Sequence, residues 1–234
     1  MIEVIPLASS SKGNCYYITD GSSPLLIDPG IKFDSIREQL NFKVSDIQAV
    51  LCSHEHNDHC KAVLDLTKAG IDCYMSQGTK DELNLESHRI NIIQAKQQFK
   101  VGPWTILPLD VKHDAKEPLA FLIAHREGYK ILYATDTYYL KYTFTGLTHI
   151  LIECNYSQQV LNENVSSGLI PIEQKKRTIR SHMSLETVKD FMRANDLSKV
   201  QEIWLLHLSS DNSHAQIFKQ EVQKVTGKMV FLAE

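Results

Sequence analysis

His54-Glu55-His56-Asn57-Asp58-His59 is the stretch of this sequence that decides its fold and its chemistry. It places three imidazoles and the Asp58 carboxylate within six residues, directly after the apolar stretch 47–51, which predicts a buried strand. Imidazole and carboxylate groups suit zinc and similar first-row metals. A strand that ends in such a loop holds the ligands on a rigid support, so the run predicts a metal site rather than a histidine-rich surface loop.

The spacing of this run differs from that of the helical H-E-x-x-H motif of metalloproteases. Position 58 is Asp where the second histidine of that motif is required. His54 and His56 are two residues apart, so on an extended segment they face the same way. Asp58 and His59 can turn toward a second point beyond them, and the spacing therefore suggests two adjacent metals.

Length and composition fit a compact enzyme. The chain has 234 residues, 43% of them hydrophobic, which is enough for one substantial core or two halves that share it. We predict a single domain, residues 1–234. The net charge of −3 gives no global signal for nucleic-acid binding, although it leaves room for a local basic groove.

Several features predict a cytoplasmic protein without a membrane segment. Residues 1–8 alternate like a strand and lack the basic and apolar regions of a signal peptide. No apolar run approaches the ~18 residues that would span a bilayer. The five cysteines are scattered and odd in number, which is typical of reduced thiols.

The order of apolar patterns predicts an α/β fold. Predicted strands cover Ile2–Leu7, Cys15–Thr19, Leu25–Asp28, Val50–Ser53, Asp72–Ser76, Phe99–Val101, Trp104–Leu109, Ala120–His125, Lys130–Ala134, Ile150–Glu153, Ile203–Leu208 and Met229–Leu232. Predicted helices cover Phe33–Leu40, Lys61–Ala69, Thr79–Leu85, Ser184–Ala194 and His214–Val225. Two sheets packed face to face, with helices outside, satisfy this order.

Three further polar residues stand where an apolar strand ends. His113 follows the strand that begins near Trp104, Asp136 follows Ile131–Ala134, and His207 lies near the end of another strand. One such residue alone is equally well explained as a hydrogen-bonded cap. Three together, beside the 54–59 run, favour metal binding.

These residues give the sequence a resemblance to the metallo-β-lactamase superfamily. The matching elements, in the family's order, are Asp28 in Leu26-Ile27-Asp28-Pro29-Gly30, the 54–59 run, His113, Asp136 and His207. The resemblance implies a four-layer αβ/βα sandwich with a two-metal site. It implies that His54, His56 and His113 hold one metal, that Asp58, His59 and His207 hold the second, and that Asp136 bridges them. Asp28 would fix the metal loop through hydrogen bonds.

A second set of motifs narrows the resemblance. Ser181-His182-Met183-Ser184, with His182 standing 25 residues before His207, is similar to paired motifs of ribonuclease Z and, more closely, of the YycJ (WalJ) group, which is linked to DNA exonuclease activity. Ser9–Cys15 and Glu153–Tyr156 also resemble that group. Two departures are Ser181 in place of Gly and Leu185 in place of Asn.

The predicted reaction is hydrolysis of a phosphodiester by a metal-bound hydroxide held between two divalent ions, zinc or manganese. Asp58 would accept a proton as well as bind metal. His182 would act as the general acid for the leaving oxygen or as a phosphate contact; the alternative is an exposed residue beside a helix start.

A local basic run bears on the substrate. Lys175, Lys176, Arg177 and Arg180 lie within six residues, just before His182. We predict that they bind substrate phosphates together with Lys12; the alternative is a solvated charged loop. The expected partner is nucleic acid, DNA rather than RNA.

Two other functions fit the same residues less closely. One is a small-molecule hydrolase of the same fold, acting on a cyclic nucleotide, thioester or lactone in a closed pocket. The other is a binding module that keeps metals for stability, against which the large ligand set argues, because structural zinc sites use four ligands.

Overall fold

A computed structural model describes residues 1–233, which form two compact units. The first unit comprises Met1–Asp110 and Ala115–Gly128, and the second comprises Val111–Asp114 and Tyr129–Ala233. The single domain predicted over residues 1–234 stays a prediction, and the units are described in turn.

The first unit contains a six-stranded sheet in the order β1-β2-β3-β4-β5-β6. Its strands are β1 (Glu3–Ser10), β2 (Gly13–Thr19), β3 (Leu25–Ile27), β4 (Ala49–Leu51), β5 (Cys73–Met75) and β6 (Ile90–Ile92). The first two pairings are antiparallel and the other three are parallel. Every residue of β3 and β4 is buried, as expected for parallel strands covered on both faces.

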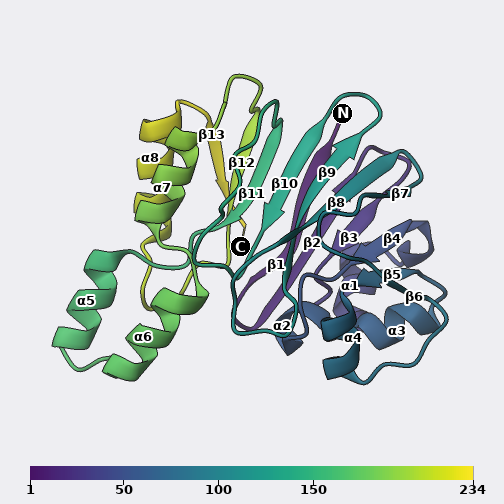
Figure 1. Cartoon of the computed structure of the whole chain (residues 1–234), viewed down its shortest axis with the longest axis horizontal. Helices are drawn as coiled ribbons and strands as arrows, with labels where there is room; N and C mark the ends of the chain where they lie inside the picture. Colours follow the sequence, from purple (N-terminus) through teal and green to yellow (C-terminus); the bar gives the residue numbers. More distant parts are fainter. Residues whose placement is uncertain (234) are drawn as a thin grey trace. The chain divides into compact units, whose positions relative to one another are not determined.

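Helices of the first unit connect the strands and cover the sheet (Figure 1). They are α1 (Phe33–Gln39), the 3-10 turn η1 (Val44–Asp46), α2 (Asn57–Cys60), α3 (Val63–Lys68) and α4 (Gln77–Leu83). Val63 and Leu66 of α3 share a core with Leu26 and Val50 of the sheet. The unit also holds an antiparallel meander of β7 (Phe99–Val101), β8 (Trp104–Asp110) and β9 (Leu119–His125).

The second unit is built on four parallel strands (Figure 1). These are β10 (Lys130–Ala134), β11 (His149–Glu153), β12 (Glu202–Leu206) and β13 (Met229–Leu232). Its helices are α5 (Gln158–Ser166), α6 (Ile172–Ser181), α7 (Leu185–Ala194) and α8 (Ala215–Thr226). The buried face of α7 carries Leu185, Val188, Phe191 and Met192, the apolar positions that predicted this helix.

The basic run lies in a helix that the sequence did not predict. Residues 172–181 form α6, and α5 was not predicted either. Leu161 is the buried residue of α5 and Ser181 that of α6, so neither helix has the apolar stripe by which a helix is identified from sequence. Within residues 1–233, no helix combines the length and apolar character required to cross a membrane.

Three strand ends share an unusual backbone conformation. Asp28 and His207 immediately follow β3 and β12, and Asp136 is the second residue after β10; their φ angles are +52°, +51° and +46°, respectively. Residues other than glycine rarely adopt this left-handed backbone conformation, and those that do cluster at functional sites. The backbone therefore marks the same strand ends that the sequence marked by residue type.

Candidate metal centre

Asp28 organises the histidines of the first unit from a fully buried position. Its Oδ2 atom accepts a hydrogen bond from Nδ1 of His59 at 2.9 Å. The same atom accepts the Ser53 hydroxyl at 2.7 Å, and the Ser53 hydroxyl lies 2.9 Å from Nδ1 of His54. The carboxylate thereby fixes the Nδ1 protons of two imidazoles, which directs their Nε2 lone pairs to a ligand.

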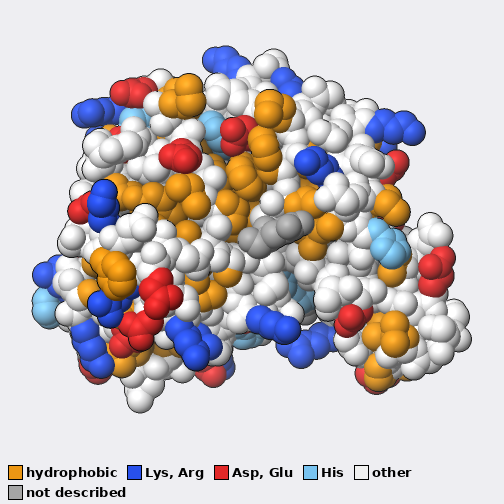
Figure 2. Space-filling model, turned by 180° about the vertical axis from the view of Figure 1, so that it is seen from behind, with side chains coloured by type: hydrophobic (Ala, Val, Ile, Leu, Met, Phe, Trp, Pro, Cys, Tyr) orange, Lys and Arg blue, Asp and Glu red, His pale blue; other side chains and the backbone are white. Residues whose placement is uncertain are grey.

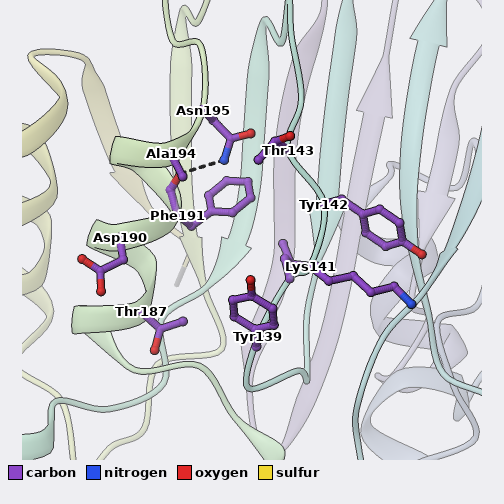
Figure 3. A pocket seen from close by; sticks show the side chains of 10 residues that line it. Tyr139, Lys141, Tyr142, Thr143, Thr187, Asp190, Phe191, Ala194 and Asn195 are labelled. Atoms are coloured by element: carbon purple, nitrogen blue, oxygen red, sulfur yellow. Dashed lines mark hydrogen bonds between the residues drawn. The ribbon is translucent and has the colours of Figure 1, made fainter.

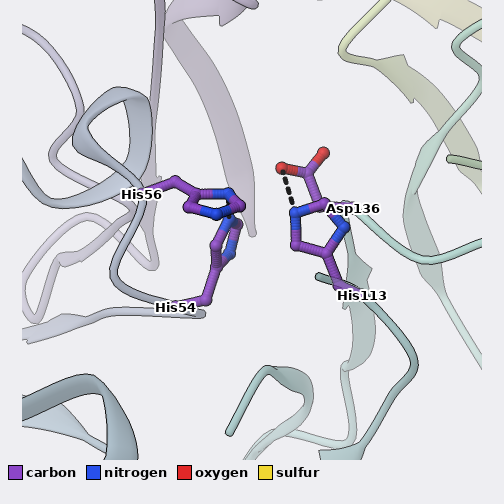
Figure 4. Close-up of side chains that lie close together, drawn as sticks. All are labelled: His54, His56, His113 and Asp136. Atoms are coloured by element: carbon purple, nitrogen blue, oxygen red, sulfur yellow. Dashed lines mark hydrogen bonds and ion pairs between the residues drawn. The ribbon is translucent and has the colours of Figure 1, made fainter. Parts of the chain in front are cut away.

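The rings of the 54–59 run lie against one another. The His54 ring centroid is 4.6 Å from that of His56 and 4.2 Å from that of His59. Nε2 of His54 is 3.0 Å from Nδ1 of His56, and the two rings, drawn in Figure 4, meet edge to face. Oδ2 of Asp58 lies 3.4 Å from Nε2 of His59. The first unit thus gathers three imidazoles and one carboxylate, the donor set that a divalent metal requires.

Two residues of neighbouring segments fit closely against this run. The amide nitrogen of Asn14, in β2, lies 3.1 Å from Nε2 of His59 and 3.4 Å from Oδ2 of Asp58. A Cβ atom added at Gly30 would lie 1.7 Å from the carbonyl oxygen of Asp58. Only a residue without a side chain therefore permits this approach between Gly30 and α2.

Glu55 and Cys60 form hydrogen bonds with the backbone instead of joining the histidine cluster. Oε1 of Glu55 accepts the backbone N–H of Lys116 at 2.7 Å. The Cys60 thiol donates to the carbonyl oxygens of Glu55 and His56, and burial raises its pKa to about 12. A thiol that keeps its proton is a poor metal ligand, and Glu55 does not stand in for the general base of an H-E-x-x-H enzyme.

The second unit gathers another group around Asp136. Oδ2 of Asp136 lies 3.7 Å from Nε2 of His113, the ion pair drawn in Figure 4. Oδ1 of the same carboxylate lies 3.5 Å from Nδ1 of His182 and 3.4 Å from Nδ1 of His207. Nδ1 of His113 lies 3.1 Å from the carbonyl oxygen of Ser181. Burial lowers the pKa of His113, which keeps its ring neutral and suited to a metal.

Glu153, the last residue of β11, contacts two histidines of this group. It is fully buried, and its Oε1 atom lies 2.6 Å from Nδ1 of His182 and 3.2 Å from Nδ1 of His207. Its Oε2 atom accepts the backbone N–H groups of Thr137 and Met183, each at 3.1 Å. Ligand atoms of Asp136, Glu153, His182 and His207 all lie within 4.8 Å of one another.

The ion pair between Glu153 and His182 shifts both groups toward their charged forms. Burial alone raises the pKa of Glu153, but the charge of His182 and the hydrogen bonds of both histidines hold it below its ordinary value. For His182, burial lowers the pKa, and the Glu153 charge with the carboxylate hydrogen bonds outweighs this and raises it to about 10. A protonated imidazole fixed in this way can donate a proton to a substrate.

The basic residues predicted to bind substrate are exposed or partly exposed. Lys175 donates to Oδ1 of Asn162 at 2.5 Å, Lys176 pairs with Glu173 at 2.8 Å, and Arg177 pairs with Asp114 at 3.2 Å. Arg180 lies exposed on α6, and Lys12 lies in the turn between β1 and β2. Lys and Arg side chains stand among Asp and Glu side chains on the face shown in Figure 2.

Sequence reasoning found Asp28 but missed Asn14, Ser53 and Glu153, which also contact the histidines. Asn14 and Ser53 carry no signal of their own in the sequence, since each is a common polar residue outside a metal-ligand spacing. Glu153 stands at the end of an apolar strand, as Asp136 and His207 do. The strand-end rule that found those residues applies to Glu153 as well.

Comparison with known proteins places this geometry in a family. A profile described as "Beta-lactamase superfamily domain" matches residues 24–208. The chain is similar to exodeoxyribonuclease YycJ of Bacillus anthracis, with 27% identity over 237 residues that cover 94% of this chain and 87% of the relative.

Solved structures agree on the fold. The metallo-β-lactamase fold protein YhfI from Bacillus subtilis superposes with a TM-score of 0.75 at 16% identity, covering 100% of this chain and 97% of that one. The short form of human tRNase Z superposes with a TM-score of 0.67 at 14% identity, covering 100% and 96%. The resemblance and the fold class drawn from the sequence are confirmed. The chain belongs to the β-lactamase superfamily, as a hydrolytic enzyme with two mixed sheets and flanking helices in the metallo-β-lactamase fold.

Proposed function

We propose that the protein is a cytoplasmic phosphodiesterase that uses two divalent metals to degrade DNA from its ends. The observation that carries this proposal is that two fully buried carboxylates each hold two histidines. Asp28 holds His59 directly and His54 through the Ser53 hydroxyl, and Glu153 contacts His182 and His207. Carboxylates that orient imidazoles in this way are typical of metal-binding histidines. His125 also meets a carboxylate, that of Asp20, but neither residue belongs to the proposed ligand set.

The ligands divide between two metals in this proposal. His54, His56 and His113 would hold the first metal. Asp58, His59 and His207 would hold the second, and Asp136 would be a ligand of both. Zinc and manganese both suit this set of imidazoles and carboxylates.

Bound metals would supply a nucleophile at neutral pH and neutralise the charge that develops on the phosphoryl oxygens. His182 donates a proton from its ring to the leaving oxygen. Glu153 holds the ring of His182 in position and favours its protonated form through the 2.6 Å contact. Asp58 accepts the proton released when the attacking water is activated.

The choice of DNA rests on the similarity to exodeoxyribonuclease YycJ and on the cations of α6. Lys175, Lys176, Arg177 and Arg180, together with Lys12, contact substrate phosphates in this proposal. If they do, replacing Lys175, Lys176 and Arg177 by Gln weakens DNA binding and flattens its dependence on salt. Unchanged binding and an unchanged salt slope would exclude this role.

The test of the function is hydrolysis by metal-stripped protein to which zinc or manganese is restored. The substrates are end-labelled single- and double-stranded DNA, RNA of the same sequence and a cyclic nucleotide, and Asp58→Ala protein is the control. Progressive loss of DNA from its ends, absent in the control, supports the proposal. Turnover of RNA but not of DNA, or of the cyclic nucleotide alone, would contradict it.

A second candidate is a small-molecule hydrolase of the same fold. It is favoured by the partners of the α6 cations, because Lys175, Lys176 and Arg177 each contact an oxygen of this chain. Cations engaged in this way have less capacity for substrate phosphates. The same hydrolysis assay separates the two candidates, since a closed small-molecule site leaves polymers intact.

A further inference from the structure

The second unit contains a pocket of about 350 Å³ outside the candidate metal centre. Its inner wall is formed by α7, which contributes Thr187 and the largely buried Phe191, and its outer wall is the segment 139–143, which leads from β10 toward β11. Figure 3 shows Phe191 reaching it from the helix and Tyr139 from the facing segment. The volume falls in the range of ligand pockets, which is about 300–1,000 Å³.

Aromatic rings give the pocket its chemical character. Phe191 is 6% exposed, and its ring packs against that of Phe144 at a centroid distance of 6.2 Å, so it forms a fixed apolar surface. Tyr139 is 55% exposed although it lines the pocket. An exposed ring that faces a buried one suits a flat ligand, because such a ligand can stack on both.

Hydrogen bonds hold the two walls at a set separation. Oδ1 of Asn195, just after α7, accepts the backbone N–H of Phe144 at 2.6 Å, and Nδ2 of Asn195 donates to the carbonyl oxygen of Phe191 at 2.7 Å. The pocket is therefore formed before any ligand arrives, which lowers the entropy cost of binding.

The outer wall is also tied to the residues proposed to act on phosphate. The Thr137 hydroxyl donates to the carbonyl oxygen of Tyr139 at 3.0 Å, while its backbone N–H donates to Oε2 of Glu153. Glu153 holds His182 through its other oxygen. Tyr139 is three residues from Asp136, so the two lie at most about 10 Å apart along the chain. A ligand in the pocket is thus close to the proposed general acid and bridging ligand.

Charge at the rim is compatible with a polyanion. Asp190 lines the pocket, but its carboxylate pairs with Arg193 at 2.9 Å. Lys141 also lines the pocket, and its ammonium lies 5.2 Å from the centroid of the Tyr142 ring. The rim therefore places a cation close to aromatic surface, the combination by which proteins bind single-stranded nucleic acid.

We propose that this pocket receives one unpaired nucleobase of a polynucleotide, stacked on Tyr139, next to the nucleotide that is cleaved. This inference rests on the proposed nuclease function and adds a binding site to it. Every base has a flat aromatic face, so the pocket accepts all four bases and favours single-stranded ends over duplex.

The test compares Tyr139→Leu with Tyr138→Leu, a matched control. Tyr138 is the adjacent residue and 42% exposed, and it does not line the pocket. Zinc-loaded proteins are titrated into a fluorescein-labelled, phosphorothioate-linked oligothymidylate, and Kd is read from anisotropy. Loss of one stacked base weakens binding about 5- to 150-fold. We expect this loss for Tyr139→Leu, with Tyr138→Leu and Tyr139→Phe near the wild-type value.

A strand of the same length that lacks bases provides the second comparison. We expect Tyr139→Leu and wild-type protein to bind it equally. An equal loss for both strands, or equal affinities of the two Leu variants for oligothymidylate, would overturn the proposal.

Turnover of bis(p-nitrophenyl) phosphate separates failure of this inference from failure of the proposed function. Wild-type protein that hydrolyses neither this compound nor DNA contradicts the nuclease proposal, while the binding comparison still decides on the pocket. We expect Tyr139→Leu to hydrolyse single-stranded DNA more slowly than Tyr138→Leu at subsaturating concentration.

Discussion

At the scale of single residues, the buried Asp28 carboxylate positions the histidines of the first unit through its hydrogen bonds. Asp28→Asn keeps the shape of the side chain but replaces one acceptor by an NH2 group. The acceptor lost is either Oδ2, which faces Nδ1 of His59 and the Ser53 hydroxyl, or Oδ1, which faces the Ser53 backbone N–H. We expect zinc affinity to fall about 10- to 100-fold, because such outer partners fix the tautomer and orientation of ligands. Calorimetric titration with zinc measures the change.

Asp20→Asn is the matched control for that measurement. Asp20 is a half-buried aspartate that also contacts a histidine, His125, at 3.2 Å. His125 is not one of the proposed metal ligands, so we expect unchanged zinc affinity. Equal losses in both variants would show that Asp28 acts through general stability rather than through the metal loop.

His182 tests the proposed acid role directly. We expect His182→Ala to lower kcat about 10²- to 10⁴-fold, the usual contribution of general acid catalysis, with the metal content unchanged. Single-turnover hydrolysis of end-labelled DNA and metal analysis of the same sample measure the two quantities. His88→Ala, at an exposed histidine, is expected to match wild-type protein. Near-normal turnover of His182→Ala would exclude the role.

His149 predicts a pH dependence of stability. It is 1% exposed at the start of β11, and burial lowers its pKa. Because the folded-state pKa lies below the unfolded value of about 6.5, stability is complete above that pH and is lost as the pH falls. When the pH is lowered from about 7 to about 5, we expect the midpoint urea concentration of unfolding to decrease less in His149→Asn than in wild-type protein. An identical fall in both proteins would contradict this.

Residue types predicted which side chains gather at the strand ends, but not what orients them. His113, Asp136 and His207 were found because each interrupts an apolar strand. The role of Glu153 depends on β11 lying beside β12 and on residues 182–183 returning to it, a tertiary arrangement that local pattern does not contain.

At the scale of elements, the approach of the β3–α1 connection to α2 depends on Gly30. We expect Gly30→Ala to cost about 1–3 kcal/mol, because its Cβ would overlap the Asp58 carbonyl, and to lower zinc content as α2 shifts. Urea unfolding and metal analysis check both. Gly128→Ala, at a turn with φ of +91° and no atom within 4 Å of the added Cβ, is expected to lose stability but keep its zinc. Equal zinc content in the two variants would contradict the prediction.

Elements with strong apolar periodicity were predicted closely. The bounds of β7, β10 and β13 agree with the sequence pattern, and α7 differs by one residue. The helices α5 and α6 were missed because they bury few apolar side chains, so their stability comes from tertiary and local contacts.

At the scale of the whole molecule, metal binding and stability are expected to be linked. Any ligand that binds only the folded chain raises its stability, by about 2.7 kcal/mol at a hundredfold excess over Kd. We expect a chelator to lower Tm and restored zinc to raise it again, as measured by calorimetry. We expect the Tm of Asp136→Ala protein to change little when chelator or zinc is added. A Tm that does not change with chelator in wild-type protein would argue against tight binding.

The family and fold class could be predicted from the sequence because the metal-ligand motifs occur in a fixed order along the chain. Separation of residues 1–233 into two compact units was not predicted, since apolar patterning specifies elements and not which of them pack together.

The left-handed backbone of Asp28, Asp136 and His207 sets a limit on engineering. Each such position costs about 1–3 kcal/mol, which glycine would recover because it has no Cβ atom. Glycine at any of these three places would relieve that backbone cost but discard a side chain that the chemistry needs. A thermostable variant that keeps its activity has to gain its stability at other positions, and a library that holds these three residues constant would yield more active clones.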